Sequence, residues 1–341
     1  MKTTATIALL MAGLSFNALA IENGTSVNWN DYNDMVKLNN SVSNAECSGT
    51  AIAGKYILTA AHCVIHSDRY VDQAITAEKQ SSSIIKVNSH PNFNEHRGNW
   101  HDVAISELNQ TINTQHIHFF ADLTNNTVKL NDNLRIFGFG NTQKNLSYAN
   151  LEMIDLGLNP EDRLDGEFIN QGNTIGGDSG GSWLDTNNNI VSVHSGSSTF
   201  PDGRRETYST NLHYAKDFIL ETINGWHYPT LANTSNGSVT IKVQSLHDTN
   251  AAYDATTSGD AQIIGSTCES TIQPFQTCTY TIESQGGTGT LHLSDSESIT
   301  INKPAPTTES SGGGDSGGSL GFLSLIGLFG LGFIRHKNAN K

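Results

Sequence analysis

Short apolar segments separated by clusters of Gly, Asn and Asp run through residues 21–228, and this spacing limits the fold more than any other feature. The segments with strand character lie at residues 50–53, 56–59, 83–87, 102–108, 134–138 and 189–193. Many short strands with frequent turns predict an antiparallel sandwich or a pair of barrels. One segment differs, because residues 213–223 carry apolar side chains at helical spacing and predict a helix that ends at Asn224 and Gly225.

The composition changes after residue 231, where Thr and Ser become abundant. Residues 238–243, 277–282 and 289–293 alternate between apolar and polar side chains, as half-buried strands do. We therefore expect a mainly β chain, in which a small β-sandwich-like domain at residues 231–303 follows a larger domain at residues 21–230.

The first 20 residues have the features of a secretory signal peptide. Lys2 supplies the positive charge, residues 7–16 form the apolar stretch, and a small-x-small cleavage site ends at Ala20. Removal of residues 1–20 would leave Ile21 as the new N-terminus. The alternative is an uncleaved anchor, but the apolar stretch is too short to span a bilayer as a mature helix.

The C-terminal end has two parts of unusual composition. Residues 304–319 form a linker rich in Gly, Ser and Pro, which predicts flexibility. Residues 320–341 combine an apolar segment, expected to form a short helix, with a basic tail. At about 1.5 Å rise per residue this segment falls short of the roughly 30 Å hydrocarbon core. We interpret it as a sorting tag or a tail anchor; a core helix is the alternative, although no amphipathic stripe is visible.

The formal net charge of −14 argues against a nucleic-acid partner, since phosphate binding needs a basic face. No spacing such as HExxH or CxxC is present, so we expect no metal and no other cofactor. Cysteines in an exported chain are expected to form disulfides. Sequence separation favours the pairs Cys47–Cys63 and Cys268–Cys278, one in each domain.

His62 follows a strand end and immediately precedes Cys63, so a disulfide at Cys63 would hold the turn that carries the imidazole. A general base must lie within about 2.6–3.2 Å of the group that it deprotonates. Asp102 opens an apolar segment, and a buried carboxylate there needs a partner. An imidazole N–H suits this carboxylate, because the pairing fixes the tautomer that accepts a serine proton.

The glycine-rich stretch at residues 172–183 places Asp178 and Ser179 between two pairs of glycines. Glycine adopts backbone conformations closed to other residues and lets a substrate approach the main chain. The N–H groups of Gly177 and Ser179 can then stabilise an oxyanion, at roughly 2.7–4 kcal/mol for each donor. The His, Asp and Ser motifs are weak one by one and strong in combination, and they predict nucleophilic catalysis by a serine.

Residues 21–228 resemble the chymotrypsin/trypsin-like serine proteases, most specifically in TAAHC around His62, DVAI at Asp102 and GDSGGS around Ser179. The resemblance implies two antiparallel β-barrels with the active site between them. It implies an endopeptidase that acts through an acyl-enzyme, with His62 as general base, Asp102 as its orienting partner and Ser179 as nucleophile. Gly177 and Ser179 would form the oxyanion hole.

The same resemblance gives the N-terminus a role. In this family a new N-terminal Ile inserts into the body of the protein, and its ammonium pairs with the Asp that precedes the nucleophile. Here that pair would be Ile21 and Asp178. Because the predicted signal cleavage itself would expose Ile21, we expect no separate zymogen step.

The residues expected around the specificity pocket depart from the family pattern. Asn173 stands where trypsin-like members have an Asp, and a neutral amide offers no full ion pair to Arg or Lys. Ile175 replaces a pocket cysteine, and Ser192 is followed by Val193 and His194 in place of Trp-Gly. The expected preference at P1, the residue before the scissile bond, is therefore not strictly Arg or Lys but neutral, small or acidic.

Residues 312–337 resemble the GlyGly-type C-terminal sorting tags of Gram-negative bacteria. The resemblance implies trimming by a rhomboid-type protease and export by type II secretion, so secretion and tag-processing machinery are expected partners beside protein or peptide substrates. The protein would be secreted or attached to the cell surface, with an inner-membrane tail or transient membrane contact before tag removal. Residues 231–303 would then be an Ig-like spacer or binding domain.

Two other functions stay open at this point. A catalytically weak protease homologue could act as a surface-binding protein, although intact His62, Asp102 and Ser179 argue against it. Alternatively, residues 231–303 could be the main functional part, as an adhesin, although they carry no stripe of aromatic side chains.

Overall fold

The computed structural model describes residues 21–65, 70–94, 100–140, 145–156, 161–169, 172–234, 237–251, 255–268 and 271–304. The expected signal peptide and the expected sorting tag lie outside these ranges. None of the helices within them has the length and apolar character needed to cross a membrane.

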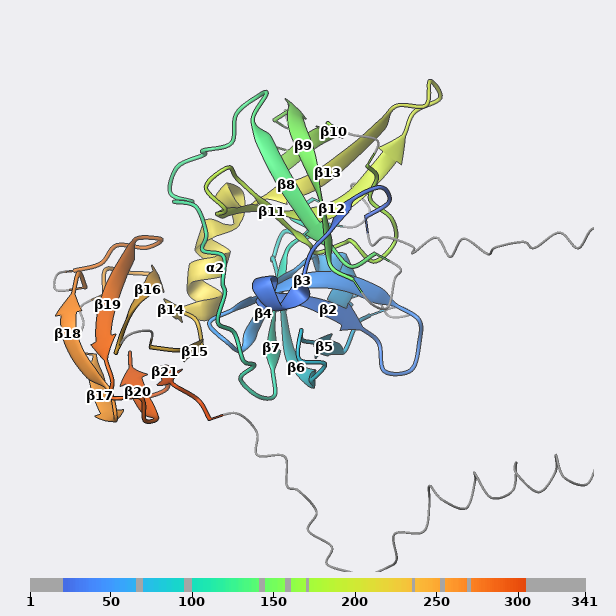
Figure 1. The fold of residues 1–341 in the computed structure, drawn as a ribbon. Helices are drawn as coiled ribbons and strands as arrows, with labels where there is room; N and C mark the ends of the chain where they lie inside the picture. Colours follow the sequence, from blue (N-terminus) through green and yellow to red (C-terminus); the bar gives the residue numbers. More distant parts are fainter. Residues whose placement is uncertain are drawn as a thin grey trace, which may run out of the picture. The chain divides into compact units, whose positions relative to one another are not determined.

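Six of the described strands close the first barrel, which is drawn in blue to teal in Figure 1. They are β2 (Met35–Asn39), β3 (Glu46–Ile52), β4 (Tyr56–Thr59), β5 (Gln73–Ile75), β6 (Ser81–Ser89) and β7 (Ala104–Leu108). Neighbours pair antiparallel in the order β2-β3-β4-β7-β6-β5, and β5 pairs back onto β2. The apolar side chains of Leu38, Ile57 and Ile105 are fully buried, as the strand pattern predicted.

Six further strands close the second barrel. They are β8 (Asn133–Gly138), β9 (Ser147–Asp155), β10 (Arg163–Phe168), β11 (Ser182–Leu184), β12 (Ile190–Thr199) and β13 (Arg205–Asn211). They pair antiparallel in the order β9-β10-β13-β12-β11-β8, and the β8–β9 pairing completes the ring. The short strand β1 (Thr25–Ser26) adds to β9. The predicted fold of two antiparallel barrels is therefore confirmed.

The helices of the described ranges are short: η1 (Trp29–Tyr32), α1 (Ala61–Ile65), η3 (Leu212–Ala215) and α2 (Lys216–Ile223). The helix predicted at residues 213–223 is present, and its first turn is the 3-10 turn η3. The Asn211 side chain accepts the N–H of His213 and caps this turn. Asn224 ends α2 in a left-handed conformation and donates its N–H to the carbonyl of Leu220.

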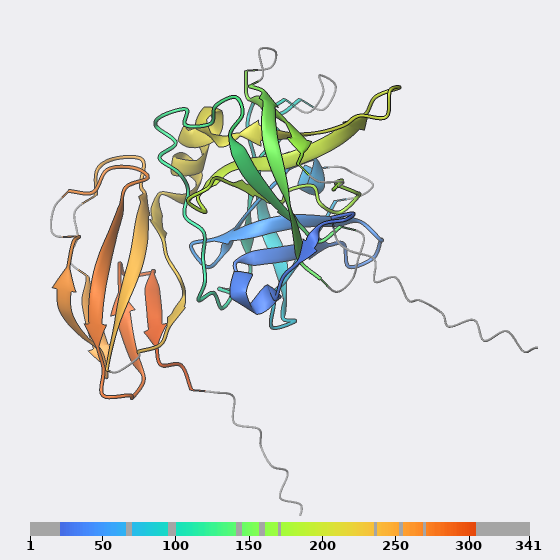
Figure 2. The same ribbon diagram turned by 45° about the horizontal axis from the view of Figure 1, so that its top comes forward.

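Two four-stranded sheets face each other in the C-terminal module (Figure 2). The first has the order β14-β16-β19-β18 and the second the order β15-β21-β20-β17. Their bounds are β14 (Gly225–His227), β15 (Leu231–Ala232), β16 (Ser238–Leu246), β17 (Thr256–Gly259), β18 (Gln262–Ser266), β19 (Thr277–Glu283), β20 (Gly289–His292) and β21 (Ser298–Ile301). Buried residues from both sheets, including Ile241, Ile282, Leu291 and Ile299, form the core, so the β-sandwich-like prediction is confirmed.

The strand β14 belongs to this module although it precedes the expected boundary at residue 231. It pairs with β16 through Gly225 to His227 and starts directly after Asn224. The buried Gln244 of β16 in turn accepts the N–H of Phe120 at 3.0 Å and donates to the carbonyl of Phe120 at 2.8 Å. The two-barrel part therefore continues into the module without an intervening linker.

Candidate active site

The imidazole of His62 and the carboxylate of Asp102 form a close pair on the first barrel. Strand β4 ends at Thr59, and His62 is the second residue of α1. Its Nδ1 lies 2.7 Å from Asp102 Oδ2, and its main-chain N–H donates to Asp102 Oδ1 at 2.9 Å. The Asp102 side chain is fully buried, whereas 23% of the His62 side chain is exposed. The carboxylate thus fixes the ring, and the ring edge stays open to solvent.

A disulfide holds the helix that carries His62. Cys47 of β3 and Cys63 of α1 are bonded, with 6.3 Å between their Cα atoms. The second disulfide joins Cys268 and Cys278 in the module, so both predicted pairs are confirmed. Cys47, His62 and Cys63 bring three ligand-type atoms close together. Both sulfurs are committed to the disulfide, so they offer no thiolate to a metal.

Ser195 of β12 is a third partner of this pair, and the sequence reasoning missed it. Its hydroxyl donates to Asp102 Oδ2, the same oxygen that faces His62 Nδ1. Ser192 is fully buried and pairs with Trp183 of β11 and Asn211 of β13, so its place in the specificity pocket stays a prediction. A register shift between His194 and Gly196 decides which hydroxyl of β12 reaches the site.

The loop that carries Ser179 is fixed from the first barrel by Ser48 of β3. The main-chain N–H of Ser48 donates to the carbonyl of Ser179 at 2.7 Å, and its hydroxyl donates to the carbonyl of Gly177 at 2.8 Å. The hydroxyl also accepts the N–H of Phe139 at 3.0 Å. Cys63 Sγ lies 3.7 Å from the carbonyl of Ser179, which brings this loop next to the helix of His62.

The main-chain N–H groups of Gly177 and Ser179 are not used in any hydrogen bond between described residues. Gly177 has a φ of 98°, a conformation that favours glycine. Gly180 has a φ of 84°, and a Cβ there would lie only 2.1 Å from Thr59 Oγ1. The two glycines therefore allow a turn whose donors point away from the protein's own acceptors.

Asp178 is buried beneath this turn. Its two oxygens accept the N–H groups of Gly140 and Ile175, each at 2.8 Å. Burial raises the pKa of Asp178 to about 7, and the two hydrogen bonds offset only part of that effect. Ile21 is also fully buried. The described residues place no basic side chain in an ion pair with Asp178.

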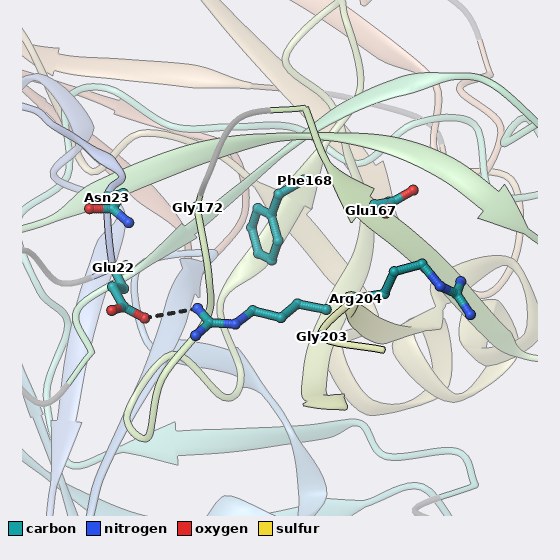
Figure 3. A pocket seen from close by; sticks show the side chains of 8 residues that line it. Glu22, Asn23, Glu167, Phe168, Gly172, Gly203 and Arg204 are labelled. Atoms are coloured by element: carbon teal, nitrogen blue, oxygen red, sulfur yellow. Dashed lines mark hydrogen bonds and ion pairs between the residues drawn. The ribbon is translucent and has the colours of Figure 1, made fainter. Parts of the chain in front are cut away.

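Asn173 contacts the N-terminal segment. Its main chain exchanges two hydrogen bonds of 2.9 Å with Glu22. Its side-chain amide donates to Glu22 Oε2 at 3.4 Å, and Arg205 forms an ion pair with the same oxygen at 3.1 Å. Glu22 also borders a cavity of about 450 Å³ that Phe168 and Arg204 help to line (Figure 3).

The first barrel supplies His62 and Asp102, and the second supplies Ser179 and Ser195, so the site forms where the barrels meet. Serine, histidine and aspartate side chains that meet at the junction of two antiparallel barrels are typical of a serine endopeptidase. The chain belongs to the trypsin family, since the family model described as Trypsin matches residues 21–219, more than half of its length.

The solved structures to which this chain is similar include two proteins of Vibrio cholerae. The VesB protease has 19% sequence identity and a TM-score of 0.47, and the match covers 82% of this chain and 97% of VesB. The secreted serine protease VesC has 14% identity and a TM-score of 0.48, covering 82% of this chain and 70% of VesC.

Proposed function

We propose that Ser179, His62 and Asp102 are the catalytic triad of this endopeptidase. Ser179 Oγ attacks the carbonyl carbon of the scissile peptide bond while His62 Nε2 takes the hydroxyl proton. When the tetrahedral intermediate collapses, the C–N bond breaks and His62 gives that proton to the leaving amine. Water then attacks the acyl ester, with His62 accepting its proton and returning a proton to Ser179 Oγ as the ester bond breaks.

The hydrogen bond between His62 Nδ1 and Asp102 Oδ2 is the observation that carries this proposal. At 2.7 Å it favours the tautomer with the proton on Nδ1, in which the lone pair of Nε2 can accept a proton. Ser195 strengthens the arrangement because its hydroxyl donates to the same carboxylate oxygen.

The N–H groups of Gly177 and Ser179 are the proposed oxyanion hole. Both are free of other hydrogen bonds within the described residues. Ser48 holds the two carbonyl groups of this loop, so the donors are set in place before substrate arrives. Such preorganised donors stabilise the negative charge of the tetrahedral intermediate.

The proposed activation step is removal of the signal peptide after Ala20. It would create an ammonium group at Ile21, and its partner would be the Asp178 carboxylate. Two observations support this pairing: Ile21 is already fully buried, and Asp178 is buried with no cationic partner among the described residues and has a pKa of about 7. A positive charge at this place would stabilise the ionised carboxylate.

The proposed cellular route rests on the sequence. The signal peptide and the tag-like residues 320–341 support export to the cell surface or the medium of a Gram-negative bacterium. The proposed role of the module at residues 231–303 is that of a spacer or binding domain attached to the protease.

A fluorophosphonate probe tests the triad. The chain starting at Ile21 is treated with the probe, the labelled peptide is located by mass, and hydrolysis of a protein substrate such as casein is followed in parallel. We expect label on Ser179, and neither label nor hydrolysis for Ser179→Ala. The matched control is Ser198→Ala, since Ser198 is an exposed serine of β12. Label on another serine, or unchanged hydrolysis by Ser179→Ala, would overturn the assignment, and a folded chain with neither property would be a binding homologue.

A further inference from the structure

Three buried polar side chains, Thr174, His194 and Thr207, form a cluster beside the proposed nucleophile. His194 Nδ1 lies 3.3 Å from Thr207 Oγ1, and Thr207 Oγ1 lies 3.4 Å from Thr174 Oγ1. Each of the three residues is at most 3% exposed. We call this group the hydroxyl–imidazole cluster.

The backbone of His194 places this cluster next to the loop of Ser179. The His194 N–H donates to the carbonyl of Gly181 at 2.8 Å, and the His194 carbonyl accepts the N–H of Gly180 at 2.8 Å. The next residue, Ser195, donates to Asp102. Thr174 approaches the cluster from the other end of the same loop, so the cluster lies within the wall of the site.

The hydrogen bonds inside the cluster are weak. Distances of 3.3 and 3.4 Å are long for groups that contain N–H or O–H donors, and the Thr207 hydroxyl has a further long contact of 3.2 Å with the carbonyl of Gly196. Burial, together with nearby His62, lowers the pKa of His194 to about 3, so its imidazole is neutral at neutral pH. Buried polar groups with weak partners gain free energy when a stronger acceptor reaches them.

The surroundings disfavour a basic P1 side chain. A buried Lys or Arg needs a carboxylate, and in the described part of the chain the nearby carboxylates are engaged. Asp102 accepts from His62 and Ser195. Asp178 accepts two main-chain N–H groups, and Glu22 pairs with Arg205.

An aromatic or aliphatic P1 side chain also fits poorly. It would cover two hydroxyl groups and an imidazole whose own hydrogen bonds are long, and it would offer them no better acceptor. A carboxylate is different, because it accepts several hydrogen bonds at once and makes them shorter and stronger through its charge.

We infer, on the basis of the proposed triad, that the hydroxyl–imidazole cluster selects substrates with an acidic P1 residue and binds its carboxylate through Thr174, Thr207 and His194. An anion next to an imidazole favours its protonated form, so His194 can take up a proton and neutralise the buried charge. Gly176, two residues after Thr174, is exposed, and a Cβ built there meets no atom within 4 Å, so this part of the loop faces solvent.

The test compares peptides that differ only at P1, with Glu, Gln, Asp, Ala, Phe or Arg, cleaved by the full chain starting at Ile21. A charge-assisted hydrogen bond contributes about 1.5–3 kcal/mol, so kcat/KM should be about 10- to 100-fold higher for Glu than for Gln or Ala. Thr174→Val, which keeps the shape and removes the hydroxyl, should lower kcat/KM about tenfold more for the Glu peptide than for the Ala peptide.

Two variants separate recognition from structure. Thr174→Ser restores a hydroxyl and should restore the preference for Glu, and Ser198→Ala on the exposed part of β12 should change neither peptide. Equal losses for the Glu and Ala peptides in Thr174→Val would mean a purely structural role and overturn the inference. The chain could be labelled on Ser179 by a fluorophosphonate and yet cleave the Arg, Phe or Ala peptide as well as the Glu peptide. This result would overturn the acidic preference alone. A chain that is neither labelled nor active would overturn the triad as well.

Discussion

His62 Nδ1 lies 2.7 Å from Asp102 Oδ2, and the other oxygen of the same carboxylate accepts the main-chain N–H of His62 at 2.9 Å. One buried side chain thereby fixes both the backbone and the ring of the proposed base. A change in the chemistry of the Asp102 side chain should therefore alter the tautomer of the imidazole more than the stability of the fold.

Asp102→Asn tests this relationship. An amide NH2 facing Nδ1 stabilises the tautomer with its proton on Nε2, which cannot accept the proton of Ser179, so kcat should fall by about 10⁴-fold. The measurement is steady-state hydrolysis of one peptide, with circular dichroism to confirm folding. Asp217→Asn is the control, since the Asp217 side chain is 79% exposed on α2. A decrease of less than tenfold would speak against the role of Asp102 in fixing the tautomer.

The buried carboxyl of Asp178 predicts a dependence of stability on pH. Its pKa is raised from 3.8 to about 7 in the folded chain. Between these values the unfolded chain loses its proton first, so the free energy of unfolding should fall as pH rises. The whole effect is roughly 4 kcal/mol and is complete above pH 7. Below pH 3.8 both states are protonated, and the group contributes nothing.

The N-terminus should control this loss of stability. Denaturant unfolding at pH 5 and pH 7.5 is compared for two forms of the Ser179→Ala chain, one starting at Ile21 and one retaining Ala20. The ammonium of Ile21 should remove most of the decrease only when Ile21 is the first residue. Asp178→Asn should abolish the difference in both forms. Equal behaviour of the two forms would show that the ammonium does not reach Asp178.

Gly180→Ala should disrupt the turn of the proposed nucleophile. Gly180 has a φ of 84°, which strains any residue with a side chain. A Cβ there would lie 2.1 Å from Thr59 Oγ1 and 2.3 Å from the carbonyl oxygen of Ser48, so there is no space for a methyl group. We expect a loss of about 1–3 kcal/mol or more in the free energy of unfolding. Gly176→Ala is the matched control, because no atom lies within 4 Å of a Cβ there. Comparable thermal unfolding of the two variants would contradict this geometry.

The two disulfides should differ in their effect on activity. Replacing Cys47 and Cys63 by Ala removes a bridge across 16 residues, which is worth about 3 kcal/mol, and frees the helix that carries His62. Both stability and kcat should fall. Replacing Cys268 and Cys278, which are 10 residues apart, should lower the stability of the module and leave kcat of the folded chain unchanged. Equal losses of kcat would refute a specific role for the first bridge.

Much of the fold follows from local patterns. The segments expected at residues 56–59, 83–87 and 134–138 fall within β4, β6 and β8, because alternating apolar residues and frequent turn residues are signals within a single strand. The two disulfides were predictable for a similar reason, since each joins cysteines close in sequence.

The pocket was harder to predict because it depends on a change of register. Nothing in residues 190–199 marks the irregularity between His194 and Gly196 that turns Ser195, rather than Ser192, toward Asp102. The pairing of Glu22 with Arg205 joins residues 183 positions apart. Such contacts arise only when both barrels are assembled, so no single stretch of sequence contains their signal.

The three residues of β14 contact both the C-terminal module and the two-barrel part of the chain. Along one edge they pair with β16 of the module, while His227 accepts the N–H of Ala53 through Nδ1 and meets the carbonyl of His118 with Nε2. A recombination breakpoint at residue 231 would thus separate β14 from the strand that it was matched to. A module moved to another protein with this sheet intact would therefore have to begin at Gly225, the first residue of β14.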